Sequence, residues 1–153
     1  MAAGERYLAY EEIVCEALCW GWIDSKARSM DDLRSALLLT PRKPASKWSR
    51  SNKIRVAQLE AAGRMAPPGR AAVEAAKTSG TWTALDDVEN LVEPAVLKSA
   101  LDAAPEARAN WDAFPRSARR ASLEWIAAAK RRETRDRRIA ETVELAAQNL
   151  RRT

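Results

Sequence analysis

The sequence predicts an α+β fold that is predominantly α-helical, with a small β-hairpin or sheet near the N-terminus and a helical C-terminal half. Ala, Leu, Glu and Arg are abundant, and these residues favour helices. Only five glycines and one phenylalanine occur among 153 residues, which argues against an all-β fold. The length fits one domain over residues 1–153, in which residues 9–49 hold a helix and the hairpin and residues 50–153 the helical region.

Apolar spacing, caps and prolines place the helices. Residues 9–20 carry apolar side chains at helical spacing, and Gly21 ends this helix. Ser49 is the expected N-cap of a helix over residues 50–62, which Gly63 ends. Prolines in the first turn predict further helices, over residues 67–78, 94–103, 105–113 and 116–130. A last helix over residues 134–151 is expected to dock through one apolar face, made of Ile139, Val143, Ala146, Ala147 and Leu150.

Two segments between the first two helices are predicted to be strands. Residues 22–26 and 33–40 have poor helical spacing and flank an Asp31-Asp32 turn, so a short β-hairpin is expected. The run Leu37-Leu38-Leu39 is also compatible with a helix, and this alternative stays open.

Composition limits the classes of function. There is no signal-peptide pattern and no apolar run of membrane-spanning length, so a cytoplasmic protein without a transmembrane segment is expected. The chain has no histidine, and Cys15 and Cys19 alone cannot complete a zinc site, so neither metal nor cofactor is expected. Both thiols, Cys15 and Cys19, are expected to be reduced and buried. Without histidine or a catalytic motif, an enzyme is not expected.

The net charge of +5 is unevenly distributed. Residues 1–40 carry four basic and seven acidic groups, whereas residues 41–64 carry seven basic groups and one acidic group. Residues 65–115 are acidic again, and residues 116–153 are basic. A nucleic-acid partner is not expected on this pattern, because such proteins do not usually interpose an acidic block.

A basic segment surrounds the predicted start of the helix at Ser49. Cations there oppose the helix dipole, whereas carboxylates would stabilise this end. Together with free backbone N–H groups, such cations are well placed to hold an anion, either a small molecule or an acidic protein surface. The alternative is a solvated basic face with one core tryptophan. The candidate residues are Arg42, Lys43, Trp48, Ser49 and Asn52.

Two tryptophans flank the glycine that ends the first helix. Trp20 and Trp22 are expected to point in different directions, one into the core and one into a groove. Asp24 follows on the first strand and is a candidate partner that orients Arg42. It is equally compatible with an ordinary surface residue.

A dense basic junction lies at residues 130–138, between the last two predicted helices. Such runs are usually solvated faces, and Glu133 and Asp136 can form ion pairs within the helix. Aromatic residues that would stack on bases are not interleaved with this run.

Five blocks of this sequence together resemble the YdeI/OmpD-associated family of small bacterial proteins, whose label refers to bacteriocin protection. The resemblance extends from about Tyr10 to Leu150, and its blocks are EEIVCEALCWGWIDS, TPRKPASKWSRSNKIRV, GRMAPPG, AAKTSGTW and AAKRRETRDRRI. It implies an α+β domain with a small sheet before a helical half. Family members commonly begin with further strands, whereas only residues 1–9 precede the first block here. An exposed sheet edge would then need a cover, for which a homodimer is one candidate.

The resemblance implies a binding and stress-protection protein and leaves two alternatives open. One is a protein–protein interaction module for an envelope or toxin-related partner. The other is an enzyme with Asp24 as base and Arg42 as electrostatic stabiliser. By motif position the resemblance implies these possible site residues: Trp22, Asp24, Arg42, Trp48, Ser49, Asn52 and Arg64.

Overall fold

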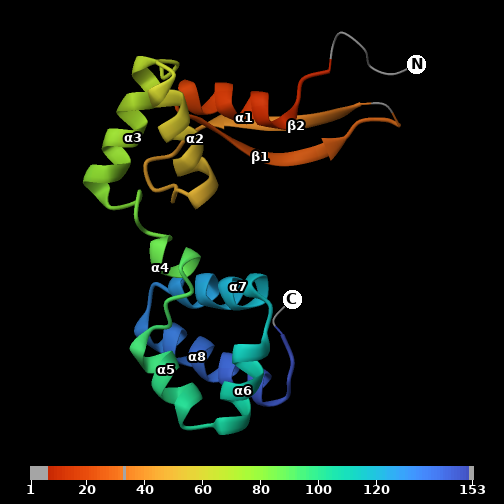
Figure 1. Cartoon of the computed structure of the whole chain (residues 1–153), viewed down its shortest axis with the longest axis vertical. Coiled ribbons are helices and arrows are strands. Elements are labelled where there is room, and N and C mark those ends of the chain that lie inside the picture. The colour runs from red at the N-terminus through yellow and green to blue at the C-terminus, as the bar shows by residue number, and fades with distance from the viewer. Residues whose placement is uncertain (1–6, 33, 152–153) are drawn as a thin grey trace. The chain divides into compact units, whose positions relative to one another are not determined.

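The computed structural model describes residues 7–32 and 34–151 and confirms the predicted α+β, mostly helical fold (Figure 1). Its contacts divide the chain into two compact units, Met1–Ala84 and Leu85–Thr153. We call these unit 1 and unit 2 and treat each by itself. The sequence-based prediction of one domain over residues 1–153 stays a prediction.

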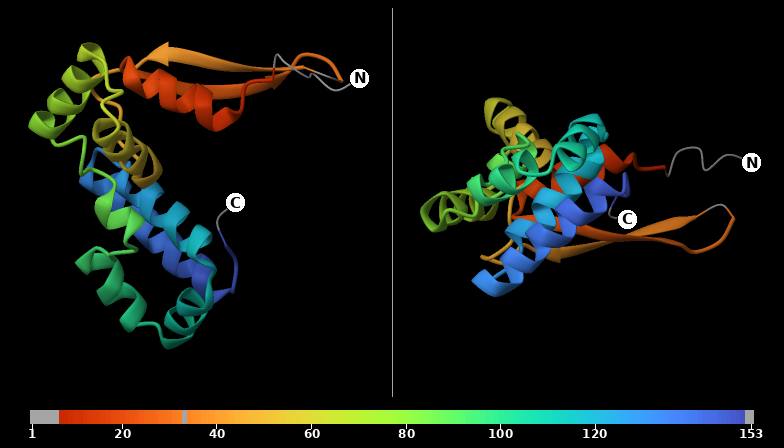
Figure 2. Two further views of the ribbon diagram at one scale, coloured as in Figure 1. Left: turned by 45° about the horizontal axis from the view of Figure 1, so that its top comes forward. Right: turned by 90° about the horizontal axis from the view of Figure 1, so that it is seen from below.

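Unit 1 holds the hairpin and three helices, in the order α1 (Tyr10–Cys19), β1 (Trp22–Ser29), β2 (Ser35–Pro41), α2 (Arg50–Ala61) and α3 (Pro67–Ser79). The two strands pair antiparallel, with α1 alongside them (Figure 2). The run Leu37-Leu38-Leu39 is strand, so the helical alternative is wrong. The predicted start of the second strand, Leu33, lies outside the described residues.

Local chemistry accounts for the ends of the unit 1 helices. Gly21, just after the C-cap of α1, has φ +75°, a left-handed conformation that glycine adopts without steric cost. Ser49 caps α2 by accepting the N–H of Asn52 at 3.3 Å. Pro67 lies in the first turn of α3, where its missing N–H costs no helical hydrogen bond. These local predictions are confirmed.

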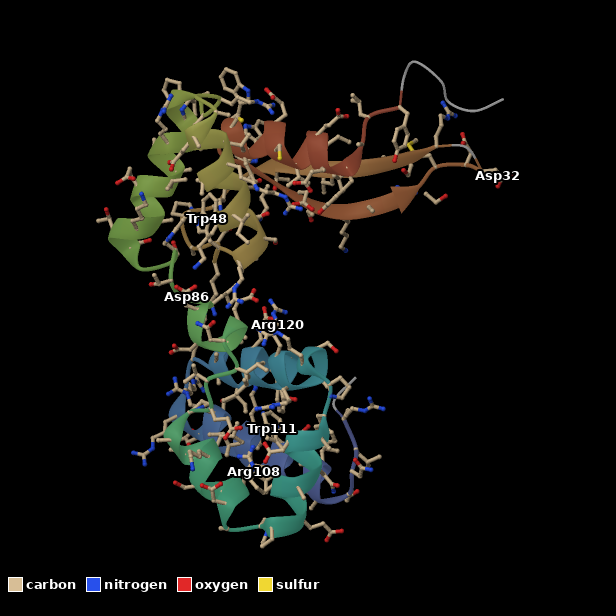
Figure 3. The ribbon with its side chains drawn as sticks, in the orientation of Figure 1. Asp32, Trp48, Asp86, Arg108, Trp111 and Arg120 are labelled. Atoms are coloured by element: carbon tan, nitrogen blue, oxygen red, sulfur yellow. The ribbon has the colours of Figure 1, made fainter. Side chains whose placement is uncertain are left out.

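The core of unit 1 joins α1, α2 and α3 through side chains that are almost fully buried. Trp48, which precedes α2, is 1% exposed and lies inside the unit (Figure 3). The half-buried Trp82 and Leu37 pack against this core. Its buried residues are Val14, Leu18, Cys19, Trp48, Val56, Leu59, Met65, Val73 and Ala76.

Unit 2 is helical over its described residues, in the order α4 (Asp86–Glu89), α5 (Ala95–Asp102), α6 (Pro105–Ala113), α7 (Arg116–Ala127) and α8 (Arg132–Ala147). The short α4 was not predicted, because a single turn leaves no periodic signal. The prediction for the last helix was wrong at its end, since α8 stops at Ala147 and Leu150 lies beyond it, 51% exposed. Asn149 turns the chain there with φ 53°.

Trp111 is the centre of the unit 2 core and is fully buried (Figure 3). The other buried members come from α4 to α8 and are Val88, Leu97, Leu101, Ala107, Leu123, Ile126, Ile139 and Ala146. In the part of the chain that the structure describes, no helix combines the length and apolar character needed to span a bilayer.

Candidate functional site

The Arg42 guanidinium is the most unusual polar group in unit 1. Its carbon Cζ lies 3.6 Å from the ring centroid of Trp48, so the two groups stack. Nη2 donates to the backbone oxygen of Lys47 at 2.7 Å. Nε and Nη1 are closed off from solvent and have no hydrogen-bond partner among residues 7–32 and 34–151. Two N–H-bearing nitrogens of a charged group are therefore left unsatisfied.

Backbone contacts fix the position of this stack. The Arg42 N–H donates to the oxygen of Gly21 at 2.9 Å, which ties the end of β2 to the turn after α1. The Trp48 N–H donates to the oxygen of Thr81 at 3.4 Å. Trp48 is thereby held next to Trp82, with ring centroids 5.0 Å apart and planes at 48°.

Trp82 was missed as a site residue by the sequence analysis. Its ring centroid lies 5.8 Å from Nζ of Lys53 and 5.8 Å from Nζ of Lys77, so two lysines from different helices flank it. Lys53 and Trp48 are about thirty residues before Trp82 in the sequence, and no local pattern could have joined them to it. With Arg42 and Trp48, Trp82 and the two lysines form a cluster of stacked aromatic and cationic groups.

A small cavity of about 80 Å³ opens beside the stack. The charged side chains of its lining are Arg42 and Lys43, and no carboxylate belongs to that lining. Alanines of α3 make the opposite wall, and the full lining is Arg42, Lys43, Pro44, Trp48, Ala72, Ala75 and Ala76. The structure thus brings together three of the predicted site residues: Arg42, Lys43 and Trp48.

Burial dominates the electrostatics of Arg42. Loss of hydration lowers the pKa of its guanidinium to about 10, and the more distant charge of Asp24 partly offsets this. At neutral pH the group is still protonated. A buried cation without an ionic partner is costly, and an anion bound next to it would offset part of that cost.

Ser49 and Asn52 have structural partners and lie outside the lining of the cavity. The Ser49 hydroxyl caps α2 and lies 3.0 Å from the hydroxyl of Ser51. Asn52 is buried, and its side-chain oxygen accepts from Nη1 of Arg55 at 2.9 Å. The predicted helix start is therefore correct, while its serine and asparagine serve the helix and not the cavity.

The lining of the Arg42 cavity does not include Trp22, Asp24 or Arg64. Asp24 accepts from the hydroxyl of Tyr10 at 2.7 Å, and no hydrogen bond or ion pair joins it to Arg42 in the described residues. Arg64 pairs with Glu16 at 3.4 Å. The expected direct pair between Asp24 and Arg42 is not formed, because the strand directs the Asp24 carboxylate to Tyr10 at the start of α1.

The expectation of one buried and one groove-lining tryptophan at this turn was wrong. Trp20 is 53% exposed and Trp22 is 41% exposed. Both line an open groove of about 620 Å³ between α1 and the hairpin. The lining of this groove, which we call the α1 groove, is Leu8, Glu12, Ile13, Glu16, Ala17, Trp20, Trp22, Leu39 and Arg64.

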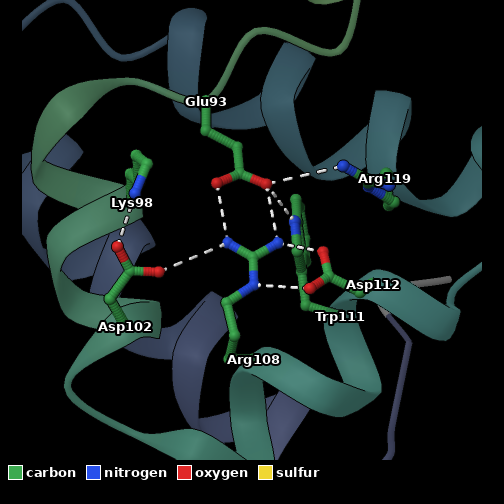
Figure 4. Close-up of polar contacts among 7 residues, drawn as sticks. All are labelled: Glu93, Lys98, Asp102, Arg108, Trp111, Asp112 and Arg119. Atoms are coloured by element: carbon green, nitrogen blue, oxygen red, sulfur yellow. Dashed lines mark hydrogen bonds and ion pairs between the residues drawn. The ribbon is translucent and has the colours of Figure 1, made fainter.

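Unit 2 contains a dense polar network around Glu93, which the sequence analysis did not identify (Figure 4). Arg108 donates to both carboxylate oxygens of Glu93, at 2.8 and 2.9 Å. Trp111 Nε1 donates to the same carboxylate at 2.8 Å, and Arg119 contacts it at 3.5 Å. Asp112 also binds Arg108. Because Glu93 lies before α5, this network ties the segment that leads into α5 to α6 and α7.

Groups able to bind metal or carry redox chemistry are not assembled in the described residues. No cluster of three or more Cys, Asp or Glu side chains there has the geometry of a metal site. Both thiols are free, Cys19 buried and Cys15 half-buried. Burial raises the pKa of each thiol, which favours the unreactive protonated form.

The geometry therefore defines an α+β, mostly helical protein with a cationic cavity and an apolar groove in unit 1. Residues 90–149 match the family model described as "Bacteriocin-protection, YdeI or OmpD-Associated". Residues 1–72 match a second model, described as "Domain of unknown function (DUF8412)". No curated protein and no solved structure matches the chain.

The predicted family resemblance is confirmed over residues 90–149 and is narrower than predicted. Of the five sequence blocks that suggested it, only AAKRRETRDRRI falls within this range. The site residues that the resemblance implied all precede residue 90, so the YdeI/OmpD-associated match does not cover them. A role for Arg42 or Trp48 has to be argued from the geometry of unit 1.

Proposed function

We propose that this protein is a non-catalytic binding protein whose Arg42 cavity holds a small oxyanion, either free or as part of a larger ligand. One observation carries the proposal. Nε and Nη1 of a buried, stacked guanidinium have no partner among the described residues, and the Arg42 side chain lines a cavity whose charged lining is cationic. A phosphate, sulfate or carboxylate oxygen is the acceptor that arginine N–H groups bind most strongly.

The size of the cavity supports a single oxyanion group. At about 80 Å³ it is far smaller than the roughly 300–1,000 Å³ of pockets that enclose drug-sized ligands. The walls of alanine and proline offer no side-chain hydrogen bonds to a base or sugar. Because both nitrogens are closed off from solvent, binding requires a small displacement of the side chains that cover them.

The test is thermal unfolding of the full chain in phosphate, sulfate or chloride at matched ionic strength. A ligand at 100 times its Kd stabilises the folded state by about 2.7 kcal/mol. Sulfate and phosphate also stabilise proteins through exclusion from the surface, so the comparison must be between variants. Arg42→Met retains the apolar stem on Trp48 and removes the charge. We expect it to lose the oxyanion-specific shift.

Lys47→Ala is the matched control, because Lys47 is exposed, lies in the same loop and is not part of the cavity lining. It should keep the full shift in melting temperature. Equal shifts in wild type and Arg42→Met would mean that the oxyanions act only through the solvent, and the proposed site would be wrong.

The family match motivates a second candidate, a stress-protection protein that binds an envelope or toxin-related partner. The observation in its favour is the match of residues 90–149 to a family described by bacteriocin protection. In a bacteriocin challenge, cells that produce the chain should survive better than cells with an empty vector. Arg42→Met should protect as well as wild type if protection resides in unit 2. Equal survival with and without the chain would remove this candidate.

A further inference from the structure

Two tryptophan rings line the α1 groove, Trp20 and Trp22, and the indole N–H of Trp20 is already used within the chain. Nε1 of Trp20 donates to Oε1 of Glu16 at 2.9 Å, so this indole is held in place from within the chain. The rest of its exposed surface is apolar ring. Trp22, Leu8 and Leu39 line the same groove, and Trp22 and Leu8 are largely exposed. Large exposed apolar patches of this kind mark interaction sites.

The charge of the α1 groove is opposite in sign to that of the whole chain. Its charged lining residues are Glu12, Glu16 and Arg64, whereas the chain carries a net +5. Glu16 is paired with Arg64 at 3.4 Å. Glu12 accepts the backbone N–H of Ala9 at 3.1 Å and has no cationic partner among the described residues. The groove therefore offers one uncompensated carboxylate, near the start of α1, and two indole rings at the other end of this helix, whose faces attract cations.

We propose that the α1 groove binds an amphipathic segment of a partner protein, with lysine or arginine next to large apolar side chains. The apolar side chains pack on Trp20, Trp22 and Leu39, and a cation of the segment pairs with Glu12. An acidic segment would bury the Glu12 carboxylate against like charge, which is unfavourable. This site is separate from the Arg42 cavity, so the two proposals stand or fall independently.

The groove geometry fits a segment of chain. At about 620 Å³ the groove is as large as pockets that hold drug-sized ligands, roughly 300–1,000 Å³. It is flanked by α1 on one side and by the hairpin on the other, and it is open to solvent. Apolar anchors in such grooves typically carry most of the binding energy, with tryptophan among the strongest.

The test uses the full chain and two synthetic amphipathic helical peptides of equal length, one of leucine and lysine and one of leucine and glutamate. Isothermal titration calorimetry should detect binding of the lysine peptide, and little or no binding of the glutamate peptide. Trp22→Ser should weaken binding about tenfold or more, because it removes an aromatic anchor. Glu12→Gln should also weaken it, and glutamine keeps the capping role of this position in α1.

Leu38→Ser is the matched control, since Leu38 is 54% exposed on β2 and is not part of the groove lining. It and Arg42→Met should leave peptide binding unchanged. Equal affinity for both peptides, or no effect of Trp22→Ser and Glu12→Gln, would overturn the proposal. Analytical ultracentrifugation of the chain alone tests whether a second copy of the chain occupies the groove instead. A dimer that Trp22→Ser dissociates would assign the groove to a second copy and would also overturn it.

Discussion

Two arginines that are shielded from solvent serve the two units in different ways. Arg108 has Glu93 and Asp112 as partners, and these hydrogen bonds raise the pKa of its guanidinium. Arg42 stacks on Trp48 and has no carboxylate within ion-pair distance among the described residues, and burial lowers the pKa of its guanidinium. The first arrangement stabilises the fold, and the second leaves hydrogen-bonding capacity that a ligand can use.

Glu93→Gln should lower the free energy of unfolding by about 3 kcal/mol. This is the lower end of the range for breaking a buried ion pair, because Asp112 still contacts Arg108. The side chain of Glu93 is 12% exposed, so water compensates little for the lost contacts. Urea unfolding followed by circular dichroism measures the change.

Glu144→Gln is the control for this substitution, since Glu144 is exposed on α8. It should change stability by no more than about 0.5 kcal/mol. A loss of similar size in both variants would show that the Glu93 network contributes nothing specific.

The same network predicts a pH dependence of stability. The hydrogen bonds from Arg108 are the largest cause that lowers the pKa of Glu93 below 4.5, with Trp111 adding to the effect. A carboxyl whose folded pKa is depressed contributes stability above its unfolded pKa and loses it as pH falls through the folded pKa. Wild type should therefore lose stability as pH falls below about 4.5, and Glu93→Gln should lose less over the same interval.

At the scale of the elements, packing sets requirements that local propensity does not. Gly69 lies within α3, where alanine would be the better helix former by about 1 kcal/mol. A Cβ on Gly69 would lie only 2.2 Å from the backbone oxygen of Cys19. The end of α1 therefore approaches α3 closely, and the Ala66 N–H donates to that same oxygen at 3.1 Å. Glycine is required here by contact between two backbones.

Gly69→Ala should therefore destabilise the protein, by about 1–3 kcal/mol, despite the gain in helix propensity. Thermal or urea unfolding measures it. The control is Ala71→Gly on the exposed side of the same helix, which should cost about 1 kcal/mol from propensity alone. If Gly69→Ala were stabilising, the close approach of α1 and α3 would be wrong.

The elements also show where sequence reasoning is reliable. Ser49 as N-cap, Gly21 after α1 and the prolines in the first turns of α3 and α6 are local signals that were predicted correctly. Pro94 and Pro115 were also expected in first turns, but they are the N-caps of α5 and α7. The end of α8 was not predicted correctly, because Leu150 continues the apolar pattern past the point where Asn149 turns the chain. An apolar pattern places the faces of a helix better than it places its end.

At the scale of the whole molecule, the two compact units correspond to separate family matches. Residues 1–72 fall within unit 1 and residues 90–149 within unit 2. Each unit also has a hydrophobic core of its own, around Trp48 and around Trp111. This correspondence predicts that unit 2 folds without unit 1.

A fragment of residues 85–153 should show helical circular dichroism and a cooperative thermal transition. It is near the lower size limit for independent domains, but its core includes a fully buried tryptophan and two fully buried leucines. The measurement is thermal unfolding of the fragment next to the full chain. An unstructured fragment, with one transition in the full chain, would instead support a single domain over residues 1–153.

The sequence by itself determined the fold class, most of the helices, the hairpin and the basic segment around Arg42. These features depend on composition, on periodicity and on neighbours a few residues apart. Only the tertiary structure decided that Trp82 joins Trp48, that Trp20 and Trp22 share a groove, and that Glu93 anchors a network. Those contacts join residues from different elements, and the free energy that selects them comes from packing and desolvation between elements, which no local pattern encodes.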